Sequence, residues 1–240
     1  MSSSTWTPRA VASEAVVRRL PLWRAVEAQH LIATRALVDS LAEQELLEAV
    51  LEASKPPLPA AASGLDYLLA TPFRYPPLSQ GSRFRARTDP GVWYGAEMVR
   101  TCCAELGYWR WRFLMDSHGL ERLDGVPHTL LHAAPQGASI DLRAKPFSRD
   151  QALWSHPDSY AATQAMARSA RAAQVAIIRY ASVRDPDHGG CGAVLDCRAF
   201  LGGGVRTRQS WFLTVDRRRA SWVRARARQA ESHEFLFAGD

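Results

Sequence analysis

The hydrophobic pattern divides the chain into helical and extended segments. Residues 28–54 predict a helix, because their apolar positions recur at helical spacing, and the proline-containing stretch SKPPLPAAASG then ends the pattern. AEMVRTCCAELGYWRWRFLMDS predicts a second helix, of about five turns. Its expected interior stripe is Met98, Cys102, Leu106 and Trp109. SYAATQAMARSARAAQ predicts a third helix. The apolar positions of the first helix are Leu31, Leu37, Val38, Leu41, Leu46, Val50 and Leu51.

Short extended segments lie between these helices. Residues 82–87 and 92–95 predict strands on either side of the turn Asp89-Pro90-Gly91, and HTLLHAA and SIDLRA predict a hairpin around PQG. QVAIIRYAS, GAVLDCRAF, RQSWFLTV and HEFLF predict further strands. Helices and strands without regular βαβ alternation indicate an α+β fold. We expect one domain overall, with an N-terminal helical segment at 1–62 joined to a core at 63–240.

Composition places the chain among globular proteins. It has 240 residues, of which 47% are hydrophobic and 22% are charged, which suffices for a sizeable core. No apolar run reaches the roughly 18 residues of a membrane span, and the N-terminus has no apolar core of a signal peptide. These patterns favour a cytoplasmic protein.

Charge and cysteines narrow the chemistry. The net charge is +6, carried almost wholly by arginine, so the surface suits nucleotide phosphates, nucleic acid or an acidic protein. Adjacent Cys102 and Cys103 do not have zinc-ligand spacing, and Cys191 and Cys197 have no matching histidine pair, so we expect no metal. His188 lies close to Cys191 in the sequence, but nothing orients the two as a nucleophile and its base.

One stretch concentrates candidate chemistry, GSRFRARTDPGVWYGAEMVRTCCAE. It carries Arg83, Tyr94 and Glu105 at intervals of eleven residues. Taken singly, Arg83 and Glu105 are typical of surface positions, and Tyr94 is typical of a half-buried aromatic at a strand end. Glu105, however, stands in the apolar run CCAEL, and a partly buried carboxylate needs partners. This makes Glu105 a candidate site residue.

The same residues carry a family resemblance. GSRF…PGVWYGAE…TCCAE resembles the core of the RES domain, a family named for an arginine, a glutamate and a serine. Arg83, Tyr94 and Glu105 fall on its positions. RYASVRD places Ser182 on the serine, and LPLWRAV places Arg24 on an N-terminal arginine. The resemblance runs from about residue 20 to the C-terminus.

The resemblance implies a fold and a function. RES domains resemble ADP-ribosyltransferases, with a split β core and helices around a cleft that holds NAD+. They are typically toxins of bacterial type II toxin–antitoxin systems, and the partner is a helix-turn-helix antitoxin that occludes the cleft. Transfer of ADP-ribose to a cellular protein is favoured here, because segment 28–62 and the basic C-terminal stretch offer docking surface. Hydrolysis or phosphorolysis of NAD+ stays an alternative.

The implied residue roles fit the chemistry. Cleavage of the nicotinamide–ribose bond builds positive charge on the ribose, which Glu105 would stabilise. Arg83 and Arg24 would hold the pyrophosphate, since arginine offers forked donors. Tyr94 would stack on nicotinamide, and Ser182 would hydrogen-bond the glutamate or a ribose hydroxyl. We therefore expect Glu105, Tyr94 and Ser182 as catalytic residues, with NAD+ bound by Arg83, Arg24, Tyr94 and Ser182.

A competing interpretation is a nucleic-acid-binding module. RRRASWVRARAR, at residues 217–228, holds six arginines and one tryptophan that could contact phosphates and stack on a base. A solvated basic face is the more usual fate of such a run, so we expect no direct nucleic-acid binding. The complete arginine, tyrosine, glutamate and serine set also argues against an inert interaction protein.

Overall fold

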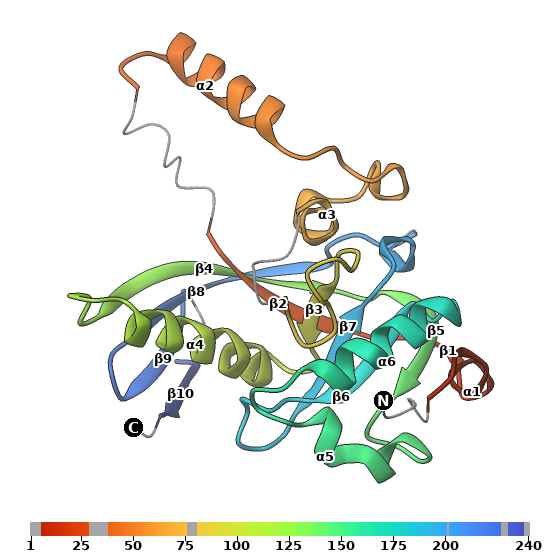
Figure 1. The fold of residues 1–240 in the computed structure, drawn as a ribbon. Coiled ribbons are helices and arrows are strands. Elements are labelled where there is room, and N and C mark those ends of the chain that lie inside the picture. Colours follow the sequence, from red (N-terminus) through yellow and green to blue (C-terminus); the bar gives the residue numbers. More distant parts are fainter. Residues whose placement is uncertain (1–5, 29–37, 76–80, 201, 227–229, 238–240) are drawn as a thin grey trace.

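A ten-stranded sheet with helices on both faces organises the chain (Figure 1). The computed structural model describes residues 6–28, 38–75, 81–200, 202–226 and 230–237. The strands are β1 (Val16–Arg19), β2 (Leu22–Glu27), β3 (Trp93–Ala96), β4 (Leu123–Ala133), β5 (Gln136–Asp141), β6 (Ile177–Ala181), β7 (Gly190–Val194), β8 (Thr207–Val215), β9 (Arg219–Arg224) and β10 (Ser232–Leu236). The helices are α1 (Pro8–Ser13), α2 (Leu41–Ser54), α3 (Tyr67–Arg74), α4 (Val99–Asp116), α5 (Gln151–Trp154) and α6 (Ala161–Ala172), with 3-10 turns η2 (Ala60–Ala62), η3 (Phe147–Asp150) and η4 (Cys197–Phe200).

The sheet order is β1-β5-β6-β7-β3-β2-β4-β8-β9-β10, and only β5 and β6 pair in parallel. The segment that connects them contains α5 and α6, which is the kind of crossover that parallel strands need. Helices and a mostly antiparallel sheet therefore combine in an α+β fold, as the sequence predicts.

The predicted hairpin around PQG is wrong. β4 pairs with β2 and β8, whereas β5 pairs with β1 and β6. β1 and β2 pair with β5 and β4 in one continuous register, from Val16 opposite Ser139 to Leu22 opposite Ala133. Pro135 interrupts the strand without reversing it, and its carbonyl accepts a hydrogen bond from the amide of Leu20 at 2.9 Å.

The N-terminal segment is only partly helical, which corrects the helical segment expected at 1–62. β1 and β2 come from this segment, and β2 lies inside the sheet between β3 and β4. The predicted helix is confirmed from Leu41 to Ser54, while Leu31 and Leu37 lie outside the described residues. Among the described helices, none is long and apolar enough to cross a membrane.

Helix α4 packs on one face of the sheet and carries Glu105. Its buried side includes Cys103, Ala104 and Gly107, and the indole of Trp222 on β9 donates to the carbonyl of Cys103 at 3.1 Å. The expected interior stripe is wrong at both ends, because Met98 and Trp109 are exposed. Small residues let the helix approach the sheet along a different side, on which Trp111 and Leu114 are also buried.

A second core covers the opposite face. Leu22, Trp93 and Leu131 are fully buried there, and Phe200 of η4 packs against Trp93 at 5.2 Å between ring centroids. Side chains alternate between the faces along each strand. Tyr94 therefore points to the α4 side of the sheet while its neighbour Trp93 points away from it.

Candidate functional site

Arg83 stands in a tight turn rather than in the strand that the sequence predicts for 82–87. A backbone bridge between Ser82 and Arg85 closes this turn, with hydrogen bonds of 2.7 and 3.1 Å. Gly81 starts it with a φ of +70°, and a Cβ there would lie 2.3 Å from the carbonyl oxygen of Arg85. Only glycine fits such a position, so the turn depends on the sequence Gly-Ser-Arg.

The phenol of Tyr94 holds this turn in place. Its oxygen lies 2.8 Å from Oγ of Ser82 and accepts a hydrogen bond from the amide of Phe84 at 3.0 Å. Burial raises the pKa of Tyr94, while these two hydrogen bonds oppose the rise. The phenol therefore bonds to the residues on both sides of Arg83, Ser82 and Phe84. In this way Tyr94 positions the turn that carries Arg83.

The guanidinium of Arg83 is also fixed. One nitrogen, Nη1, donates to the carbonyls of Trp154 and His156, each at 3.0 Å. Its carbon lies 4.8 Å from the ring centroid of Tyr160, as in a cation–π contact. The Arg83 guanidinium is therefore oriented before any ligand binds, and its other nitrogens can donate hydrogen bonds to a ligand.

Glu105 and Ser182 are in direct contact. The hydroxyl of Ser182 donates to Oε1 of Glu105 at 2.5 Å, and Ser182 is fully buried. Its oxygen accepts from the amides of Arg184 and Asp185 at 3.1 and 2.9 Å. Because a hydroxyl has one hydrogen, these two donors commit that hydrogen to the carboxylate. Ser182 therefore orients Glu105 from inside the protein.

Opposing effects act on the Glu105 carboxyl. Burial raises its pKa, and the hydrogen bond from Ser182 and the charges of Arg83 and Arg184 lower it, with Asp185 adding a small rise. Burial wins, so the pKa stays above the ordinary glutamate value. The result is a partly desolvated carboxyl group that feels the charges of two cationic side chains.

Arg184 and two aromatic residues complete the site. The Arg184 guanidinium lies 3.8 Å from the ring centroid of Tyr108 and donates to the carbonyl of Pro157 at 2.6 Å. Trp109 packs edge-on against Tyr108, and 49% of its surface is exposed. Sequence reasoning did not identify these three residues. The sequence feature that could have indicated this part of the site is the position of Tyr108 and Trp109, one helical turn after Glu105.

Asp185 locks the Ser182 loop onto α4. Its buried carboxylate accepts hydrogen bonds from Arg100 and from Oγ1 of Thr101, the latter at 2.8 Å. Gly189 lies against this pair, and a Cβ there would be 2.1 Å from Oγ1 of Thr101. The close approach fixes the distance between the serine loop and the helix that carries Glu105.

Arg24 lies on the other face of the sheet. It shares one face of β2 with Leu22 and Val26 of the second core, and its guanidinium lies 5.6 Å from the Trp93 ring centroid. Nη1 donates to the carbonyl of Tyr94 at 3.0 Å, and burial lowers the pKa of Arg24 to about 10. The structure therefore brings together Arg83, Tyr94, Glu105 and Ser182, and places Arg24 behind them.

A RES domain model matches residues 57–216, which include the Arg83, Tyr94, Glu105 and Ser182 positions. The chain belongs to the RES domain family. Its structure is similar to a chain in the crystal structure of the M. tuberculosis MbcT–MbcA toxin–antitoxin complex. The TM-score is 0.50 at 13% identity, over 87% of this chain and 90% of that one, so the likeness concerns the fold. No curated protein matches the sequence.

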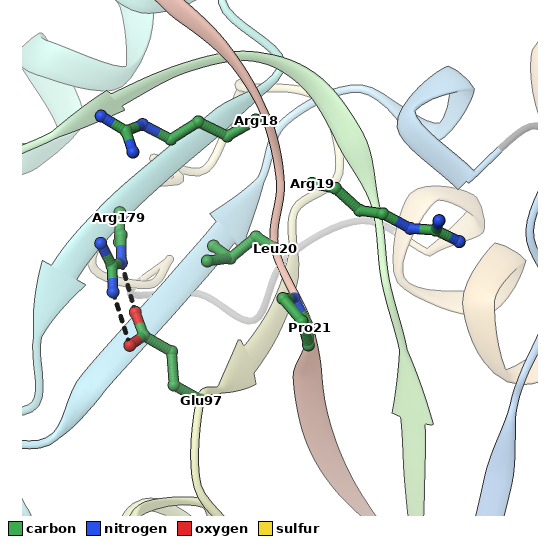
Figure 2. A pocket seen from close by; sticks show the side chains of 6 residues that line it. All are labelled: Arg18, Arg19, Leu20, Pro21, Glu97 and Arg179. Atoms are coloured by element: carbon green, nitrogen blue, oxygen red, sulfur yellow. Dashed lines mark hydrogen bonds and ion pairs between the residues drawn. The ribbon is translucent and has the colours of Figure 1, made fainter.

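A separate hollow lies on the second face of this RES domain (Figure 2). It measures about 470 Å³ and is lined by Arg18, Arg19, Leu20, Pro21, Glu97 and Arg179. Figure 2 shows Arg179 bonded to the Glu97 carboxylate, with one nitrogen at 2.7 Å from Oε2. Arg179 also donates to Asp141 at 3.1 Å. These ion pairs occupy Arg179 and Glu97, while Arg18 and Arg19 also line the hollow.

The cysteines of the RES domain are not arranged for chemistry. All four are free and buried. Burial raises the pKa of Cys102 to about 12 and that of Cys191 well above its ordinary value, so both thiols stay protonated. The ring of His188 bonds to the carbonyl of Ser182. This agrees with the expectation that His188 and Cys191 do not form a nucleophile and its base. Among the described residues, no His, Cys, Asp and Glu cluster could hold a metal ion.

Within the arginine-rich stretch, the described residues 217–226 are built into the sheet and its adjoining turns. Part of it is β9, a strand that the sequence analysis did not predict. Trp222 is fully buried, so its ring cannot stack on a base. Arg217 pairs with Glu121, and Arg219 pairs with Asp216 and Glu234. These contacts argue against the nucleic-acid-binding interpretation.

Proposed function

We propose that this RES domain protein is the toxin of a toxin–antitoxin pair and that it consumes NAD+. In this proposal it cleaves the nicotinamide–ribose bond and transfers ADP-ribose to a cellular protein. Family membership and the likeness to a chain from a toxin–antitoxin complex support the toxin assignment. The observation that carries the chemistry is the buried hydrogen bond by which Ser182 orients the Glu105 carboxyl group, on which the charges of Arg83 and Arg184 act.

Glu105 would act on the charge that develops in the transition state. As the bond from ribose C1′ to the nicotinamide nitrogen breaks, nicotinamide leaves as a neutral base with the bonding electron pair. The ribose becomes oxocarbenium-like, and an ionised carboxylate beside it lowers the barrier. Because the partly buried site contains few competing solvent dipoles, the stabilisation is larger than it would be in water.

Arg83 would hold the pyrophosphate. Two backbone carbonyls and Tyr160 fix its guanidinium, so binding costs little side-chain entropy. Forked N–H donors match phosphate oxygens better than a lysine ammonium does. Tyr94 contributes indirectly by fixing the turn on which Arg83 stands.

The surface beside Glu105 supports a macromolecular acceptor. Trp109 is half exposed on α4, and Arg184 stacks beside it on Tyr108. Exposed tryptophan and arginine are residue types that anchor protein interfaces. A nucleophilic side chain of the acceptor would form the new bond to C1′ and release its proton.

The test is incubation of the purified chain with NAD+ labelled in the adenylate half and a lysate of its own host cells. Labelled protein supports transfer. Free ADP-ribose alone indicates hydrolysis, and a phosphorylated ADP-ribose formed only with added phosphate indicates phosphorolysis. If NAD+ persists in all samples while the chain is folded, the NAD+ assignment is wrong. Glu105→Gln serves as the matched inactive control.

A further inference from the structure

Helix α2 has no packed face. None of its residues is buried, and the helix projects from the body of the molecule (Figure 1). Among the described residues, Arg74 holds the C-terminal end of α2, since it pairs with Glu52 at 2.7 Å and donates to the carbonyl of Pro56 at 2.5 Å. Isolated helices of about 12–15 residues are marginal in water, because most helical stability comes from packing. A 14-residue helix in this state therefore needs a covering partner.

One side of α2 is suited to packing. At 100° per residue, Leu46 and Val50 lie with Ala42 and Ala53 within about 80° of one another, and Glu43 and Leu47 follow at one edge of this face. Leu46 is 66% exposed and Val50 is 56% exposed. The acidic residues Glu45, Glu48 and Glu52 lie on the opposite side, together with Leu41. The apolar face is thus broad, and these three carboxylates would stay in solvent if it were covered.

Charge along the helix axis indicates the occupant. The N-terminal end carries Asp39 and Glu43, and the C-terminal end carries Lys55 and Arg74, which both pair with Glu52 and leave a net positive charge there. A second α2 running antiparallel would bring acidic ends beside basic ends and would oppose the two helix dipoles. A parallel copy would bring acid beside acid. We propose that α2 packs antiparallel against α2 of a second copy of this chain, around a two-fold axis near the middle of the helix.

This contact is separate from the candidate catalytic site. α2 ends at Ser54, before residue 57, where the match to the RES domain model begins. Alanine at positions 42, 49 and 53 allows the two helices to approach closely. The dimer does not depend on the proposed NAD+ chemistry, and its test uses no activity assay.

The first test is the mass of the full chain in sedimentation equilibrium, in a Glu105→Gln background chosen for ease of production. We expect twice the monomer mass. Leu46→Glu with Val50→Glu should weaken association by roughly tenfold or more, because it removes buried apolar contacts. Leu41→Glu is the matched control, an exposed leucine on the acidic side, and it should leave the dimer intact.

The second test fixes the orientation. Chains with Ala42→Cys are mixed with differently tagged chains with Ala53→Cys and oxidised, while the four native cysteines are buried. Antiparallel packing predicts disulfides between unlike chains, whereas disulfides between like chains would overturn the orientation. A monomer at every concentration tested would overturn the dimer. Protection of α2 amides from hydrogen exchange only after addition of an antitoxin would also overturn it, and would assign the face to that protein.

Discussion

The hydroxyl of Ser182 donates to Oε1 of Glu105 at 2.5 Å and accepts hydrogen bonds from two backbone amides of its own loop. This contact joins the loop after β6 to helix α4, across 77 residues of sequence. It removes the rotational freedom of the hydroxyl, so the carboxylate is oriented by a group that is itself fixed. Ser182 is too deeply buried to be a nucleophile, and its effect must pass through Glu105.

Ser182→Ala should reduce NAD+ turnover and alter its pH dependence. The lost hydrogen bond involves a charged acceptor, so we expect a cost of about 1.5–3 kcal/mol, or roughly 10- to 100-fold in rate. Because that bond lowers the pKa of Glu105, its removal should move the acid limb of the kcat/KM profile to higher pH. Ser13→Ala, at an exposed serine, is the control. An unchanged pH profile would show that Ser182 does not act through Glu105.

Glu105→Gln should abolish most turnover and yet stabilise the fold at neutral pH. Loss of a positioned charge commonly costs about 10²–10³ in rate. The folded-state pKa of Glu105 is raised, mainly by burial, so ionisation of this group costs folding free energy as pH rises through that pKa. Glutamine avoids this cost. Urea unfolding should show the stability gain at pH 7, and the gain should vanish below the ordinary glutamate pKa.

Arg83→Lys should raise the KM for NAD+ while leaving the pH profile in place. Lysine keeps the positive charge that acts on Glu105, but it cannot combine two carbonyl contacts, the Tyr160 stack and forked phosphate binding. We expect a KM increase of roughly tenfold, or about 1.4 kcal/mol. Arg87→Lys, at an exposed arginine four residues on, is the control. Equal KM values for the two variants would make Arg83 a purely structural residue.

Trp109→Ala should separate protein labelling from NAD+ consumption. Trp109 is exposed one helical turn after Glu105 and its ring packs against Tyr108, so we expect that NAD+ is still cleaved. Removal of an interface tryptophan typically costs about 2 kcal/mol or more in binding, which predicts a loss of labelled protein of roughly 30-fold. Phe113→Ala, one turn further along α4 and also exposed, should label normally. Loss of both activities in a folded Trp109 variant would place this side chain in the NAD+ site.

Local patterns predicted the helix that carries Glu105, the strands β6, β8 and β10, and only part of β7, since the predicted strand GAVLDCRAF ends in the 3-10 turn η4. The grouping of Arg83, Tyr94, Glu105 and Ser182 came from the family resemblance. Local patterns failed where segments that are distant in the sequence determine how the strands pair. β4 and β5 look like a hairpin because Pro135 resembles a turn, but β1 and β2 supply the pairing edges that keep the segment extended. Strand preference depends on such neighbours more than on the residues themselves.

The candidate site also combines features that the sequence predicts with features that depend on distant segments. The sequence identified Glu105 as a carboxylate in apolar surroundings, and the structure adds the donor that orients it. It could not show that Arg24 lies behind the sheet, because one residue of register decides which face a strand side chain takes. Nor could it show Arg184 stacked on Tyr108, since the two residues come from separate elements.

The last prediction concerns inhibition by the antitoxin. The chain is basic, with a net charge of +6, so an acidic contact surface on the partner would speed association. We expect a carboxylate of the antitoxin, from its C-terminal segment, to sit beside Arg83 where the pyrophosphate would bind. Inhibition should then be competitive with NAD+, and rising NAD+ should restore turnover in the purified complex. Arg83→Lys should weaken this competition, and Arg87→Lys should not. An antitoxin shortened at its C-terminus that still inhibits fully would mean that it distorts the cleft from outside.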